Sequence, residues 1–114
     1  MATGTIKKIN KQETLINNSS TTISTSYSST GKSFTITSDA LVKISIGYNN
    51  VKPLALGCKA SQSSSSTDQM YVESSQSNTA GLAVTGLLVP ATYYVWAKAS
   101  GSGADNISVT AVYL

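Results

Sequence analysis

Apolar and polar residues alternate along most of the chain, with the period of two that is typical of β-strands. Val42, Ile44 and Ile46, for example, alternate with Lys43 and Ser45. Successive side chains of a strand point to opposite faces, so each such run can bury one face and leave the other polar. No window repeats apolar residues at helical spacing, and we predict no substantial helix. The alternation predicts ten short strands, at residues 3–9, 14–17, 21–26, 33–37, 41–47, 54–59, 70–73, 82–85, 92–99 and 107–114.

Turn-forming residues separate these runs at short intervals. Residues 38–40 and 101–106 are predicted to close hairpins, and the serine-rich stretches 60–68 and 74–81 to form long exposed loops. The pattern favours an all-β fold, a two-layer antiparallel β-sandwich with jelly-roll connectivity. An immunoglobulin-like sandwich is the alternative, but the Cys…Trp…Cys spacing of those domains is absent. We expect one domain, residues 1–114, in which 1–16 form a docking arm or an edge strand.

The composition excludes several classes of protein. Only 11% of the 114 residues are charged, the net charge is +3, and the lysines are scattered apart from Lys7, Lys8 and Lys11. Without arginine there is no bidentate fork for phosphates or guanine edges, so no nucleic-acid partner is predicted. The apolar runs are too short for a membrane helix, so no membrane insertion is predicted either.

The residues that usually carry catalysis are few. The chain has no histidine, which removes the ordinary nucleophile–base pair. Residues 29–33 resemble the end of a phosphate-binding loop, but position 26 is Ser26 and a strand follows, so a turn explains Gly31 better. Cys58 is expected to be a small buried hydrophobe. The acids lie in separate segments: Glu13, Asp39, Asp68, Glu73 and Asp105.

We therefore predict no enzyme, no cofactor and no catalytic residue. No metal site is predicted, although a calcium ion bound by Asp105, Asn106 and nearby carbonyl oxygens stays open as an alternative.

The last two predicted strands are apolar on both faces. Tyr93 and Tyr94 must point to opposite sides of their strand, so Tyr94 and Trp96 lie either under a loop or on a surface covered by a partner. The terminal strand likewise sets Val112 and Leu114 against the face of Tyr113. We infer a subunit interface that contains Tyr94, Trp96, Val112, Leu114 and Tyr113.

The C-terminal third resembles a known kind of domain. The segment Val89-Pro90-Ala91-Thr92-Tyr93, its strand, a Gly/Ser-rich connection and the closing strand are similar to the end of trimeric jelly-roll heads. These tumour-necrosis-factor-like and C1q-like heads occur in accessory structural proteins of tailed phages, where a glycine is common at the position of Thr92. The resemblance implies a homotrimer on the outside of a virion, made in the cytoplasm of the host bacterium. Its partners would be further copies and other virion proteins such as capsid or tail.

Two classes of function remain open. The first is a non-enzymatic virion structural protein, such as a capsid decoration or a head or tail fibre component, with or without a receptor-binding role. The alternative is a carbohydrate-binding or adhesin-type module that contacts a host cell-surface glycan. That alternative requires Tyr94, Trp96 or Tyr71 to be exposed and coplanar in a groove, because such rings combine apolar area with a polar tip.

Overall fold

The computed structural model describes residues 9–75 and 80–114 of the chain. These residues form eight β-strands and no helix, so none of their segments is a helix that could cross a membrane. The strands are β1 Lys11–Ile23, β2 Ser28–Ile36, β3 Ala40–Gly47, β4 Pro53–Lys59, β5 Asp68–Glu73, β6 Gly81–Leu88, β7 Ala91–Ala99 and β8 Gly103–Tyr113.

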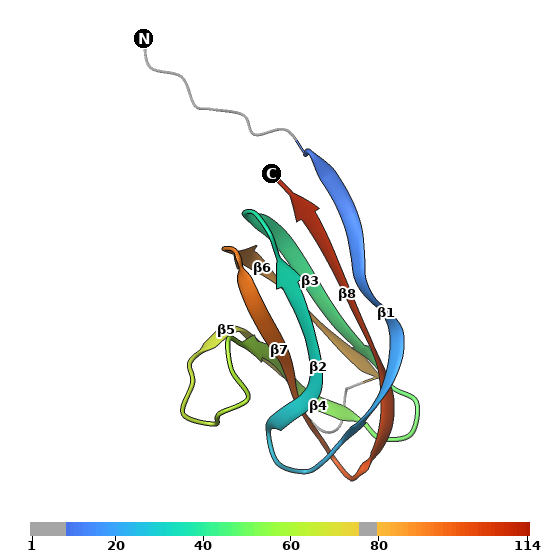
Figure 1. The fold of residues 1–114 in the computed structure, drawn as a ribbon. Helices are drawn as coiled ribbons and strands as arrows, with labels where there is room; N and C mark the ends of the chain where they lie inside the picture. The colour runs from blue at the N-terminus through green and yellow to red at the C-terminus, as the bar shows by residue number, and fades with distance from the viewer. Residues whose placement is uncertain (1–8, 76–79) are drawn as a thin grey trace.

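The strands form two four-stranded antiparallel sheets that pack face to face (Figure 1). The first, called here the β1 sheet, has the order β1-β8-β3-β6, and the second, the β2 sheet, has the order β2-β7-β4-β5. Successive strands alternate between the sheets, except that β4 and β5 are neighbours in one sheet. This is the strand order of a jelly roll, so the predicted two-layer antiparallel sandwich with jelly-roll connectivity is confirmed.

Two predicted hairpins are corners between the sheets. Residues 38–40 connect β2 to β3, and the connection after Ala99 leads from β7 to β8. In both cases the two strands belong to different sheets, so the hairpin predictions are wrong. Turn residues mark where the chain reverses, but they do not reveal whether the next strand pairs with the last one or crosses to the opposite layer.

Strand β1 joins two segments that the sequence suggested were separate. Its pairing with β8 shifts register between Thr14 and Ile16 and again between Ile16 and Ser19, and Asn18 has a positive φ of 49°. Bulges absorb extra residues without ending a strand, which explains why residues 14–17 and 21–26 were predicted as two strands. Gly31, with φ 81°, likewise lies at a register shift within β2 and not in a turn. Of the predicted strand 3–9, residues 3–8 lie outside the described residues.

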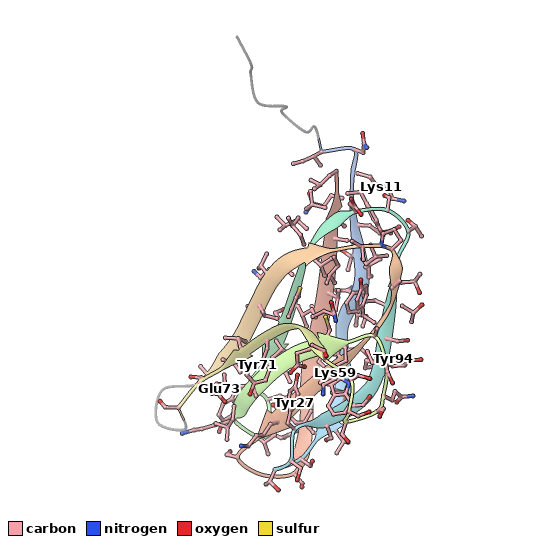
Figure 2. All side chains as sticks on the ribbon, turned by 90° about the vertical axis from the view of Figure 1, so that its left-hand side faces the viewer. Lys11, Tyr27, Lys59, Tyr71, Glu73 and Tyr94 are labelled. Carbon is pink, nitrogen blue, oxygen red and sulfur yellow. The ribbon has the colours of Figure 1, made fainter. Side chains whose placement is uncertain are left out.

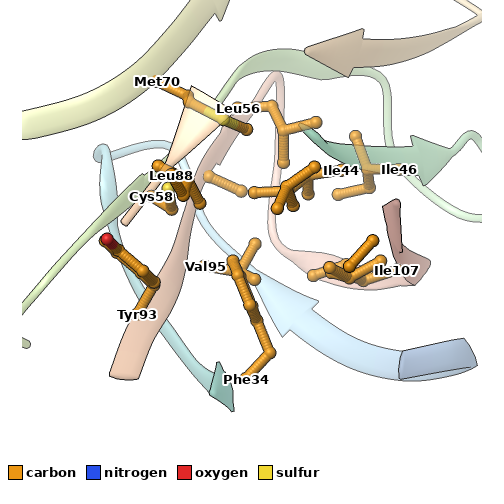
Figure 3. Packing of buried hydrophobic residues seen from close by; sticks show 14 of the residues in the cluster. Phe34, Ile44, Ile46, Leu56, Cys58, Met70, Leu88, Tyr93, Val95 and Ile107 are labelled. Carbon is orange, nitrogen blue, oxygen red and sulfur yellow. The ribbon is translucent and has the colours of Figure 1, made fainter. Parts of the chain in front are cut away.

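The core lies between the two sheets and consists of the inward-facing side chains that the alternation predicted (Figure 3). Ile44 and Ile46 from β3 and Ile107 from β8 pack against Leu56 from β4 and Val95 from β7. Cys58 is fully buried in this core as a free thiol, as predicted. Burial raises the pKa of this thiol to about 12.

Candidate functional site

The outer face of the β2 sheet gathers most of the aromatic residues that point away from the core. Strand register places Trp96 of β7 beside Gly57 of β4, and Gly57 beside Tyr71 of β5. Tyr94 lies one step further along β7, beside Lys59. Tyr71, Tyr94 and Trp96, the three residues named for the carbohydrate-binding alternative, therefore share one face of one sheet. Figure 2 shows this side of the molecule.

Four side chains on this face contact one another and are called here the aromatic–lysine cluster: Tyr27, Lys59, Tyr71 and Trp96. The ring of Tyr27 lies 5.3 Å from that of Tyr71 at an interplanar angle of 89°, and 5.5 Å from that of Trp96. The contact with Tyr71 is edge-to-face and the contact with Trp96 is tilted at 42°. Edge-to-face contacts stabilise aromatic pairs beyond the area they bury. Gly57 makes room for the cluster, because a Cβ at this position would meet the hydroxyl of Tyr27 and the carbonyl oxygen of Met70.

Lys59 places a positive charge beneath the surface of this cluster. Its residue is only 6% exposed, and its Nζ lies 4.3 Å from the ring centroid of Trp96 and 5.7 Å from that of Tyr27. The ammonium donates hydrogen bonds to the carbonyl oxygens of Ser64 (3.3 Å) and Ser66 (2.9 Å). A buried ammonium needs such compensation, and ring faces and carbonyl dipoles supply it here.

The loop that connects β4 to β5, residues 60–67 and called here the serine loop, folds back over the sheet. The indole N–H of Trp96 donates to the carbonyl oxygen of Ser61 at 3.1 Å, and the hydroxyl of Ser29 donates to Gln62 Oε1 at 3.2 Å. Together with the bonds from Lys59, these contacts hold the loop against β2, β4 and β7. Residues 60–67 do form a loop, as predicted, but the sequence did not identify it as the loop that covers Trp96.

The serine loop leaves Trp96 only 3% exposed within a single chain. The loop alternative is therefore correct for Trp96, and the predictions that its side chain contacts a partner subunit or a glycan are wrong. The alternation gave the direction of the indole correctly. It gave no information about which segment of the same chain would cover it.

The part of this face that stays open lies around Tyr71, whose residue is 44% exposed. Its hydroxyl donates to Glu73 Oε2 at 3.1 Å, and its pKa is raised by burial and by that bond. Tyr27 donates to Asp68 Oδ1 at 2.7 Å, and burial and then Asp68 raise its pKa well above the usual range. Both phenols therefore stay protonated at neutral pH. They can act as hydrogen-bond donors and stacking surfaces, and not as bases.

The outer face of the β1 sheet carries the other candidate surface. Register places Val112 of β8 beside Leu41 of β3, and Leu41 beside Leu87 of β6. Leu87 is 70% exposed and Leu41 40% exposed. We call these three residues the apolar row. The next row along the same strands, on the same outer face, is polar, with Thr110, Lys43 and Thr85 side by side.

The predicted subunit interface is divided by the fold. Tyr94 and Trp96 lie on the outer face of the β2 sheet, whereas Val112 lies on the outer face of the β1 sheet, with the core between them. Tyr113 faces the core and is buried there, so its predicted role as a contact residue is wrong. Val112 and Leu114 are half-buried at the surface. Leu41 and Leu87 were missed, and the signal that could have identified them is an apolar residue on the polar side of its strand.

Asp105 stabilises the connection between β3 and β4. Its carboxylate is fully buried, and Oδ1 accepts hydrogen bonds from the backbone N–H groups of Asn49 (2.8 Å), Asn50 (2.9 Å) and Val51 (3.3 Å). A calcium ion at Oδ1 would have to displace these three donors. In the described part of the chain, no three Asp, Glu, His or Cys side chains come together as metal ligands.

Comparison of the chain with family models, with curated proteins and with solved structures finds no match. The function must therefore be inferred from the two surfaces of this sandwich.

Proposed function

We propose that the chain is a non-enzymatic structural protein of a bacteriophage virion and that it works as a homo-oligomer. It would be an external accessory protein, such as a capsid decoration or a component of a head or tail fibre. The observation that carries the proposal is the apolar row, Leu41, Leu87 and Val112. These three neighbours project from a sheet face whose next row is threonine and lysine. Contiguous exposed apolar residues with a polar surround are typical of interaction sites, whereas isolated ones are not.

The energetics of the row favour association. Fully burying a leucine side chain contributes about 1.5–3 kcal/mol. Leu87, which is 70% exposed, still has most of that gain available, and Leu41, which is 40% exposed, has less than half of it. In an oligomer each copy contributes its own row, so the gain multiplies with the number of subunits. The jelly-roll topology supports the proposal more weakly, because viral capsid proteins share this architecture with lectins and cupins.

The first test is the molar mass in solution, measured by light scattering coupled to size-exclusion chromatography. We expect the wild-type chain to be oligomeric and the double variant Leu41→Ser, Leu87→Ser to dissociate at equal concentration. Tyr48→Ser is the matched control, because Tyr48 is an exposed apolar residue that follows the other end of β3. Equal masses for the wild type and the double variant would overturn the role of the apolar row.

The second test is location. We expect antibodies against the purified chain to label the outside of intact virions of the phage that encodes it, as seen by electron microscopy. Unlabelled virions, with the chain found only in the soluble lysate, would refute the virion assignment whatever the oligomeric state.

A carbohydrate-binding module remains the second candidate because Tyr71 is exposed next to Glu73, and Tyr94 lies on the same sheet face. Ring contact through Tyr27 links Tyr71 to the single tryptophan, so a bound sugar should change the emission of Trp96. A saturable change on titration with oligosaccharides, lost in Tyr71→Ala but kept in Tyr48→Ala, would favour this candidate. An unchanged spectrum would count against it.

A further inference from the structure

The sandwich has four edge strands, and three of them carry features that discourage pairing with another chain. β1 contains Lys11 and Glu13 and has two register shifts. β2 contains Lys32 and has one shift, and β5 is six residues long with Asp68 and Glu73 at its ends. Charges, bulges and short length are the means by which natural proteins protect sheet edges.

The fourth edge, β6, has none of these features. Its sequence, Gly-Leu-Ala-Val-Thr-Gly-Leu-Leu, contains no charge, and it pairs with β3 over all eight positions without a register shift. Within residues 9–75 and 80–114, no strand pairs with its other side. A long, regular and uncharged edge presents a continuous row of backbone donors and acceptors to a further strand.

The side chains of β6 also remain incompletely covered on both faces. Leu82 and Val84 point inward and pack on the core, yet they are only half-buried, and none of the described strands lies beyond them. Leu87 points outward at the end of the apolar row and is 70% exposed. A strand added at this edge would cover the inward-facing Leu82 and Val84 and the outward-facing Leu87 at once.

We propose that β6 pairs antiparallel with β6 of a second copy of this chain, so that two β1 sheets join into one eight-stranded sheet across a twofold axis. The inference rests on the self-association in the proposed function, and it names the strand that makes the contact. Strand addition of this kind draws its affinity from main-chain hydrogen bonds and its specificity from the side chains on either face.

A second copy fits this edge because β6 is compatible with itself. Residues opposite one another in an antiparallel pair lie on the same face, and like charges in opposite positions destabilise the pair. An uncharged strand brings no such repulsion against its own copy. Pairing centred on Thr85 would place Leu87 against Ala83 of the copy, so that the most exposed leucine lies on a small apolar residue. A twofold contact uses the same patch on both subunits and closes as a dimer.

The test compares charge at this edge with charge at the opposite edge. Ala83 and Thr14 are both exposed strand residues, on β6 and β1 respectively. We expect Ala83→Lys to weaken self-association by about tenfold or more, because each lysine would replace the small apolar residue against which Leu87 of the other copy packs and would place a charge on the shared edge. Thr14→Lys adds the same charge and should leave the mass unchanged. Thermal unfolding of each variant at a concentration where it is monomeric shows that the fold is intact.

Cross-linking supplies a second readout that does not depend on the lysine variant folding. The native thiol, Cys58, is buried in the core, so the wild type provides the background. With a short bis-maleimide at micromolar protein, Thr85→Cys should give a covalent dimer and Thr14→Cys should not. Equal cross-linking of the two variants would overturn the proposal.

The mass separates this inference from the proposed function. A dimer that Ala83→Lys dissociates supports both. A trimer, or an oligomer that Leu41→Ser dissociates and Ala83→Lys does not, overturns β6 pairing and leaves self-association in place. A wild-type monomer at millimolar concentration overturns β6 pairing, and the virion-labelling experiment then decides the rest of the proposed function.

Discussion

Replacing Lys59 with methionine tests whether the buried ammonium holds the serine loop in place. Methionine keeps an unbranched apolar side chain of similar length but removes the charge. The change deletes two hydrogen bonds from a charged donor, at 3.3 and 2.9 Å, and the contact with Trp96 at 4.3 Å. Each charged hydrogen bond is worth about 1.5–3 kcal/mol and the cation–π contact about 0.5–2 kcal/mol.

These contributions are not lost in full, because the variant no longer has to bury a charge and the freed carbonyl groups can bind water. We therefore expect the free energy of unfolding to fall by only about 1–3 kcal/mol. The larger effect is local. Without Lys59 the serine loop keeps the bond from the Trp96 indole to Ser61 and the bond between Ser29 and Gln62, and it should open well below the global unfolding temperature.

Trp96 is the only tryptophan of the chain, so its fluorescence reports on this loop directly. In Lys59→Met we expect red-shifted emission, faster quenching by acrylamide and proteolytic cleavage within residues 60–67, with far-ultraviolet circular dichroism unchanged. Lys98→Met is the control, since Lys98 is an exposed lysine on the same strand as Trp96. If Lys59→Met has the wild-type emission and quenching rate, the loop is held by other contacts and the reasoning fails.

Further predictions concern the interior. Asp105→Ala should lower the free energy of unfolding by about 2–4 kcal/mol, because three backbone N–H groups lose their acceptor. Asp105→Asn keeps an acceptor oxygen and should lower it by less than about 1.5 kcal/mol. Urea titrations measure both values, and equal losses would contradict this role of Asp105. Gly57→Ala should cost about 1–3 kcal/mol and displace the ring of Tyr27, visible as a shifted tyrosine signal in near-ultraviolet circular dichroism. Burial raises the pKa of Cys58 from 9.0 to about 12, so at pH 8 its reaction with a disulfide reagent should be about a thousandfold slower than in the unfolded chain. Because the pKa is higher in the folded state, the same shift predicts that stability falls as the pH rises from about 9 towards 12 in alkaline unfolding curves; flat curves there would be inconsistent with it.

The alternation of residues was sufficient to predict most of the strands and the core, because burial between two sheets imposes a period of two. Ile44, Leu56 and Val95 face the core as their positions require. The sequence was less informative where the backbone is irregular. The register shifts around Asn18 keep β1 continuous across the polar residues that separate the strands predicted at 14–17 and 21–26.

The candidate site was harder to predict, because it depends on which strands are neighbours. Tyr27 meets Trp96 and Tyr71 only once β4, β5 and β7 lie side by side, and the sequence contains no signal for that order. From the sequence, Lys59 is expected to be a solvent-exposed residue on the polar side of its strand. In the structure it is buried because the serine loop folds over it.

The two outer faces differ in how their apolar residues are covered, and this difference determines where a partner can bind. On the β2 sheet the chain covers its own tryptophan with the serine loop, at the cost of burying Lys59. On the β1 sheet nothing in the described residues covers Leu87, although it is the more exposed side chain. Apolar area that a chain can cover by itself gives no drive to associate, whereas area left open does. Association is therefore expected at the edge formed by β6 and the apolar row, and not at the tryptophan.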